Sequence, residues 1–101
     1  MEEYQKYIIY KCGFVFHGIV FDTSIKHSEQ YRHVKIRTPS VEKYAAGLCI
    51  IDKKEGRIET CFGDSESLEL KAGHRDAFIL TKCLGEDFFN EIRREYAAKD
   101  V

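Results

Sequence analysis

Apolar and aromatic residues dominate the segment 7–22, and two glycines interrupt them, at Cys12-Gly13 and at His17-Gly18. Runs rich in isoleucine, valine, phenylalanine and tyrosine favour β-strands, and a glycine supplies the positive φ of a tight turn. The pattern predicts a hairpin of strand, break and strand, with a single bent and bulged strand as the alternative. Both glycines give reasonable cross-strand partners, so the register stays open.

A second hairpin is predicted further along the chain. Residues 44–51 are apolar on both alternating sets, as expected for a strand that is covered on two faces. The turn 52–56 ends in glycine, and residues 57–62 then alternate. This alternation places Ile58, Thr60 and Phe62 on one side of the strand, and Arg57, Glu59 and Cys61 on the other. The first strand of this hairpin is therefore expected near the centre of a sheet.

The segment between the two hairpins is predicted to form a helix. Residues 25–35 are mostly polar, with a sparse apolar set. The preceding residues 22–24, Asp-Thr-Ser, offer three successive N-caps. The only proline, Pro39, favours an extended conformation at the residue before it and so marks the loop that leaves the helix.

Two further helices are predicted near the C-terminus. Residues 76–84 and 87–99 carry apolar side chains at helical spacing, and Gly85 ends the first of the two. Residues 68–70 add at most a short edge strand. The order β-β-α-β-β-(β)-α-α predicts an α+β fold in which two antiparallel hairpins form one sheet. The helices are expected to pack on one face of it.

Length and composition predict one small globular domain over residues 1–101. Hydrophobic residues make up 44% of the chain, which is ample for a packed core. A domain of this size has little stability in reserve, so burial of further apolar surface in a homodimer would be economical. The apolar runs are much shorter than a bilayer span and the N-terminus is acidic, so we expect neither a membrane helix nor a signal peptide.

Net charge and cysteine content limit the kinds of partner, metal site and cellular location that we expect. The net charge is −1, so any binding to nucleic acid or to an anionic membrane must be local. The four cysteines lie far apart and form no Cys-x-x-Cys pair, which argues against a metal site and favours buried free thiols. Free thiols fit a reducing compartment, so a cytoplasmic location is expected. No cofactor is predicted.

The segment 62–67, Phe-Gly-Asp-Ser-Glu-Ser, is the most suggestive of chemistry. It resembles the Gly-Asp-Ser block of the GDSL-type serine hydrolases, which implies Ser65 as a nucleophile. The resemblance is confined to this segment, and the Asp-x-x-His of that family is absent from the residues that follow. Nucleophilic catalysis needs a positioned base, so Asp64, His74 and His27 complete the set of catalytic candidates. Whether the protein is an enzyme stays open.

Two other interpretations of this turn compete with catalysis. In the preferred one, its short oxygen-bearing side chains bind backbone N–H groups at the end of a strand. In the other, the turn binds a phosphate or a nucleotide. Gly63 would let the backbone approach the ligand, Ser65 and Ser67 would donate hydroxyl groups, and Arg75 would neutralise charge. Two neighbouring carboxylates oppose an anion at this position.

Two surfaces are predicted as partner contacts. One is an aromatic stripe on the last helix, which packs in the core or, where exposed, against a second copy or another protein. The stripe comprises Phe88, Phe89, Ile92 and Tyr96. The other is the basic segment 26–37, with Arg32 and Lys35, which would contact nucleic acid or an acidic protein. The main expectation is a small non-enzymatic binding or assembly protein that forms a homodimer.

Overall fold

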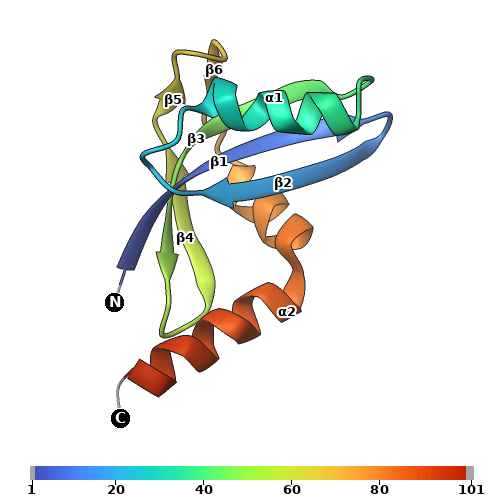
Figure 1. The fold of residues 1–101 in the computed structure, drawn as a ribbon. Helices are drawn as coiled ribbons and strands as arrows, with labels where there is room; N and C mark the ends of the chain where they lie inside the picture. Colours follow the sequence, from blue (N-terminus) through green and yellow to red (C-terminus); the bar gives the residue numbers. More distant parts are fainter. Residues whose placement is uncertain (1, 100–101) are drawn as a thin grey trace.

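The computed structural model describes residues 2–99 and contains a four-stranded antiparallel sheet with helices on both of its faces (Figure 1). The strands are β1 (Glu2–Cys12), β2 (Val15–Phe21), β3 (Glu42–Asp52) and β4 (Arg57–Phe62). They lie in the order β2-β1-β3-β4, so the two hairpins join through β1 and β3 at the centre. The α+β class is confirmed.

The remaining elements cover opposite faces of the sheet. One face carries α1 (His27–Arg37) and a two-stranded ribbon of β5 (Asp64–Ser65) and β6 (Leu70–Lys71). The other face carries α2 (Asp76–Lys99) (Figure 1). The expectation of helices on a single face is wrong, because the inner strands are apolar on both sides and each side needs cover. The ribbon replaces the edge strand that was predicted over 68–70.

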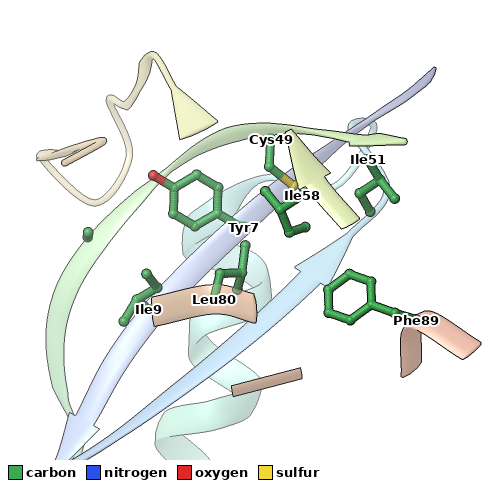
Figure 2. Packing of buried hydrophobic residues seen from close by; sticks show 8 residues of the cluster. Tyr7, Ile9, Cys49, Ile51, Ile58, Leu80 and Phe89 are labelled. Atoms are coloured by element: carbon green, nitrogen blue, oxygen red, sulfur yellow. The ribbon is translucent and has the colours of Figure 1, made fainter. Parts of the chain in front are cut away.

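This three-layer arrangement produces two hydrophobic cores. The larger core, between the sheet and α2, comprises Tyr7, Ile9, Ala45, Cys49, Ile51, Ile58, Leu80 and Phe89 (Figure 2). The smaller core, beneath α1 and the ribbon, comprises Ile8, Phe21, Ala46 and Leu68. Successive residues of a strand point to opposite faces, so β1 supplies both cores from adjacent positions.

The cysteines of the larger core act as small apolar side chains. Burial raises the pKa of Cys49 and that of Cys61 to about 12, so both thiols keep their protons at neutral pH. All four cysteines are free thiols; Cys49 is buried, and Cys12, Cys61 and Cys83 are partly exposed.

Two β-bulges interrupt the alternation of side chains along the sheet. The pairing of β3 with β4 skips Glu59, and as a result Ile58 and Cys61 both pack in the larger core. The predicted placement of Cys61 on the same side as Arg57 and Glu59 is therefore wrong. The pairing of β1 with β3 skips Tyr44 in the same way.

The strand β2 runs without interruption through Gly18, so of the two glycines that could mark the break, it is Gly13 that forms the turn. A Cβ atom at position 18 would lie 2.7 Å from Cδ1 of Leu80 and 3.2 Å from Cβ of Cys83. Glycine at this position therefore allows α2 to pack closely on β2.

The helix α1 begins later than predicted and receives its cap from a distant segment. Its N-cap residue makes no side-chain hydrogen bond, and Asp22 instead closes a local turn, with Oδ1 accepting the Ser24 N–H at 2.8 Å. The N–H of Ser28, in the first turn, donates to the hydroxyl of Ser67 at 3.1 Å. The ribbon therefore caps α1, in place of the predicted caps at 22–24.

The two C-terminal helices predicted over 76–84 and 87–99 correspond to the two halves of α2, which meet at a kink at Gly85. Gly85 has a non-helical φ of 82° within the 24 residues of α2. The two halves of the bent helix place Leu80 and Phe89 in the same core (Figure 2). Within residues 2–99, no helix combines the length and apolar character needed to cross a membrane.

A buried polar pair fixes the start of α2 to the centre of the sheet. The Tyr7 hydroxyl donates to Oδ2 of Asp76 at 2.5 Å, and the Gly73 N–H donates to the same oxygen at 2.7 Å. Tyr7 is 0% exposed and Asp76 is 1% exposed. Burial and the adjacent carboxylate raise the pKa of Tyr7, so its hydroxyl keeps the proton that it donates.

Replacement of Tyr7 by phenylalanine should lower the free energy of unfolding by about 1.5–3 kcal/mol, because it removes a hydrogen bond to a buried carboxylate. Urea denaturation measures this change. Tyr4→Phe is the matched control, since Tyr4 lies on the same strand and is 55% exposed. Equal stability of the two variants would contradict the role assigned to the pair.

Replacement of Gly18 by alanine should destabilise the protein by about 1–3 kcal/mol through overpacking against Leu80. Leu80→Ala alone should cost about 2–5 kcal/mol, because it leaves a cavity in the larger core. The double variant should cost less than the sum of the two, since the shortened side chain makes room for the new methyl group. Strict additivity in urea denaturation would show that the two positions do not contact each other.

Candidate functional site

The turn that the sequence singles out forms one wall of an open cleft of about 550 Å³. The opposite wall includes the N-terminus of α1, and β1 and β3 contribute one residue each. The lining residues are Lys6, Lys26, His27, Leu48, Asp64, Ser65, Glu66 and Ser67. The fold thus brings His27 to the same cleft as Asp64, Ser65 and Ser67, which lie far from it in the sequence.

The structure places the other predicted residues of this site elsewhere. His74 and Arg75 lie just before α2 and line a separate cavity of about 210 Å³. Neither lines the cleft. The positive charges of the cleft are those of Lys6 and Lys26. Lys26 was predicted only as part of the basic segment 26–37, and Lys6 was not predicted. Alternation along β1 places Lys6 on the same face as Ile8, and this was the available signal.

The serine hydroxyls of the cleft bind backbone groups. Ser65 is 3% exposed, and its Oγ accepts the Leu68 N–H at 3.3 Å. The Oγ of Ser67 accepts the N–H that caps α1 and lies 3.5 Å from Oγ of Ser65. Gly63 has a φ of 79°, and its carbonyl accepts the Ala72 N–H at 3.0 Å. These contacts close the ribbon and support the structural interpretation of the turn.

His27 is a buried link between α1 and the sheet. Its Nε2 lies 2.9 Å from the carbonyl oxygen of Gly47. A carbonyl oxygen only accepts hydrogen bonds, so Nε2 carries a proton and donates it. The ring meets Phe21 edge to face, at 5.5 Å between centroids. Burial lowers the pKa of His27, so the imidazole is neutral near pH 7.

The charges around the cleft are balanced. Lys6 and Lys26 face Asp64 and Glu66, so the cleft has no net charge that would attract phosphate. The Lys6 ammonium also donates to the backbone carbonyl of Ile25 at 2.7 Å. Among residues 2–99, no histidine nitrogen forms a hydrogen bond with Ser65, so the cleft shows no nucleophile–base pair.

The aromatic stripe predicted as a partner contact is mostly used inside the protein. Phe89 is 5% exposed and belongs to the larger core. Phe88 and Ile92 pack against that core, and Tyr96 is partly buried. Little of this stripe is therefore left for a partner.

The basic segment forms an exposed face of α1. Arg32 and Lys35 are both exposed on this helix. Lys35 and Arg37 occupy its last turn, where positive charge stabilises the negative end of the helix dipole. Part of the basic character is thus explained by the helix itself.

Exposed apolar side chains gather at the tip of the first hairpin, a surface that the sequence analysis missed. Phe14 is 99% exposed and Val15 is 58% exposed. The ring of Phe16 meets that of Tyr44 edge to face, at 4.8 Å between centroids, and Phe78 of α2 is 60% exposed. An alternating apolar pattern predicts that these side chains are buried in a core. The pattern does not show how far along the strand the covering helix extends, so it cannot reveal that these residues stay exposed.

Comparison with protein-family models, with curated proteins and with solved structures finds no match to this chain. Its function is therefore inferred from the surfaces and clefts described above.

The buried imidazole should make the stability of the protein depend on pH. The pKa of His27 is lowered on folding, so between that value and about 6.5, the ordinary value for histidine, the unfolded chain binds more protons. Stability should fall as the pH drops through this window, by at most about 1.4 kcal/mol per pH unit.

Urea denaturation between pH 7.5 and pH 5 tests this expectation. His27→Gln should flatten the dependence in the upper part of that range, above the titration of most carboxylates. His33→Gln is the control, because His33 is exposed on the same helix. Lys6 and Asp64 both influence His27 and are retained in both variants. If the free energy of unfolding of the wild type and of His27→Gln changed with pH in the same way, His27 would not be the source of the pH dependence.

Proposed function

We propose that this protein acts by binding and that it forms a homodimer through the outer edge of β2. The observation that carries this proposal is a difference between the two edges of the sheet. β2 and β4 are the outer strands, and each has one row of backbone N–H and C=O groups with no strand partner within residues 2–99. Such rows are templates for pairing with another strand unless they are protected.

The edge formed by β4 carries two kinds of protection. Its pairing with β3 is interrupted by the bulge at Glu59, which distorts the strand. Its exposed side chains include the charged residues Arg57 and Glu59. Bulges and charges are the devices that natural sheets use against edge-to-edge association.

The edge formed by β2 has neither a bulge nor charged side chains. Its sequence, Val-Phe-His-Gly-Ile-Val-Phe, contains no Lys, Arg, Asp, Glu or proline. All seven of its residues pair with β1 in regular register. Val15, the first residue of the strand, and Phe14, in the turn before it, are exposed. A second copy of the chain offers the same uncharged edge, so two β2 strands can pair antiparallel about a two-fold axis.

The other functions considered from the sequence have less support. The hydroxyl groups of the cleft are engaged by backbone N–H groups and its charges cancel, which weakens the case for phosphate binding or hydrolysis. The basic segment 26–37 belongs to a chain with a net charge of −1, which weakens the case for nucleic acid. The free thiols suit a reducing cytoplasm, which we propose as its location.

The double variant Phe14→Lys, Val15→Lys should dissociate the dimer. It places positive charges at the start of the pairing edge, at exposed positions where folding is little affected. Sedimentation velocity over a wide concentration range should show a dimeric wild type. The dimer dissociation constant of the variant should be at least about tenfold higher.

Ile36→Lys is the matched control, because Ile36 is 70% exposed on α1, away from β2. It should leave the dimer intact. A wild type that is monomeric at all concentrations would overturn the proposal. So would a double variant that dimerises as tightly as the control.

A further inference from the structure

A further concave site lies on the α2 side of the sheet, between the first hairpin and the first half of α2. Its volume is about 420 Å³, within the range of about 300–1,000 Å³ that is typical of small-molecule sites. The lining residues are Phe16, Tyr44, Arg75, Phe78, Ile79, Lys82 and Cys83. We call this site the hairpin groove.

A β-bulge in β3 places Tyr44 at the floor of the hairpin groove. Regular alternation would turn Tyr44 away from α2, because its neighbour Ala45 faces the larger core. The bulge at Tyr44 brings its ring to the α2 side, where it packs edge to face on Phe16. Phe78 and Ile79 form the opposite wall, so the groove is mainly aromatic and aliphatic.

The charged side chains that line the hairpin groove are all positive. Its lining includes the cations of Arg75 and Lys82 and no carboxylate. Neither cation forms a salt bridge within 4.0 Å with any of residues 2–99. The Lys82 ammonium lies 5.4 Å from the centroid of the Phe78 ring, which holds it beside the apolar wall. Arg75 lies just before the N-terminus of α2, the positive end of the helix dipole.

We propose that the hairpin groove binds a small organic anion with an apolar body, such as an alkyl or aryl carboxylate. The apolar body would lie among Phe16, Tyr44 and Phe78, and the anionic group would face Arg75 and Lys82. Charge complementarity selects this class, because an uncharged apolar ligand would leave both cations without a counterion. The hairpin groove differs from the proposed dimer edge, because six of its seven lining residues lie outside β2 and only Phe16 belongs to that strand.

Titration of the isotope-labelled protein with sodium octanoate, followed by amide chemical shifts, tests the proposal. Saturable shifts should concentrate at the groove residues of α2. 1-Octanol, which has the same apolar chain without charge, should bind at least about fivefold more weakly. Sodium acetate, which has the charge without the chain, should give no saturable shift.

Variants separate the two halves of the site. Arg75→Gln and Lys82→Gln should each raise the octanoate dissociation constant about three- to tenfold, and Phe78→Ser should do the same for both octanoate and 1-octanol. Arg32→Gln on α1 removes an exposed cation elsewhere and should leave binding unchanged.

Absence of saturable octanoate shifts, or shifts confined to residues outside the hairpin groove, would overturn the proposal. Equal binding of octanoate and 1-octanol would overturn it as well, because the groove would then be an apolar surface without anion selectivity. An acidic peptide that binds the groove while octanoate does not would reassign the site to a protein partner.

Discussion

The hydrogen bond from Tyr7 to Asp76 is the constraint on which the arrangement of the layers depends. A carboxylate as enclosed as Asp76 is costly unless hydrogen bonds satisfy it, and the Tyr7 hydroxyl and the Gly73 N–H do so together. Tyr7 lies on an inner strand, so this bond fixes the start of α2 above the middle of the sheet. The packing of α2 on β2, its bend and the hairpin groove are all positioned by that start.

The sheet itself divides the molecule into two chemically different sides. The α2 side contains the larger core and the hairpin groove, where aromatic rings meet two cations. The α1 side contains the smaller core and the cleft, where hydroxyl groups and balanced charges mostly serve the backbone. The serine hydroxyls on the α1 side thus accept hydrogen bonds from the backbone, and the exposed aromatic side chains lie mainly on the α2 side and at the tip of the first hairpin.

Local patterns in the sequence were enough to predict the two hairpins and the α+β class, because period-two apolar runs and turn glycines are encoded within each segment. Bulges were not predictable in this way, since the positions of Tyr44 and Glu59 are decided by the register with another strand. The structural role of each glycine could not be predicted, for the same reason. Gly13 makes a turn, Gly18 allows α2 to pack closely on β2, and Gly85 separates the two halves of α2. Only the neighbours in space distinguish these roles.

The candidate site was predictable only in part. Residues 64–67 of the predicted turn do line a cleft, but its cations are Lys6 and Lys26 instead of Arg75. Alternation gives the face of β1 on which Lys6 lies, and only the folded chain places that face beside the turn. The cap that Ser67 provides for α1 has a further consequence for how this chain tolerates change. The ribbon of β5 and β6 lies between β4 and α2 in the chain and beside the start of α1 in space (Figure 1). Shortening the ribbon would uncover the start of a helix almost forty positions earlier in the chain, so the two segments are constrained to vary together.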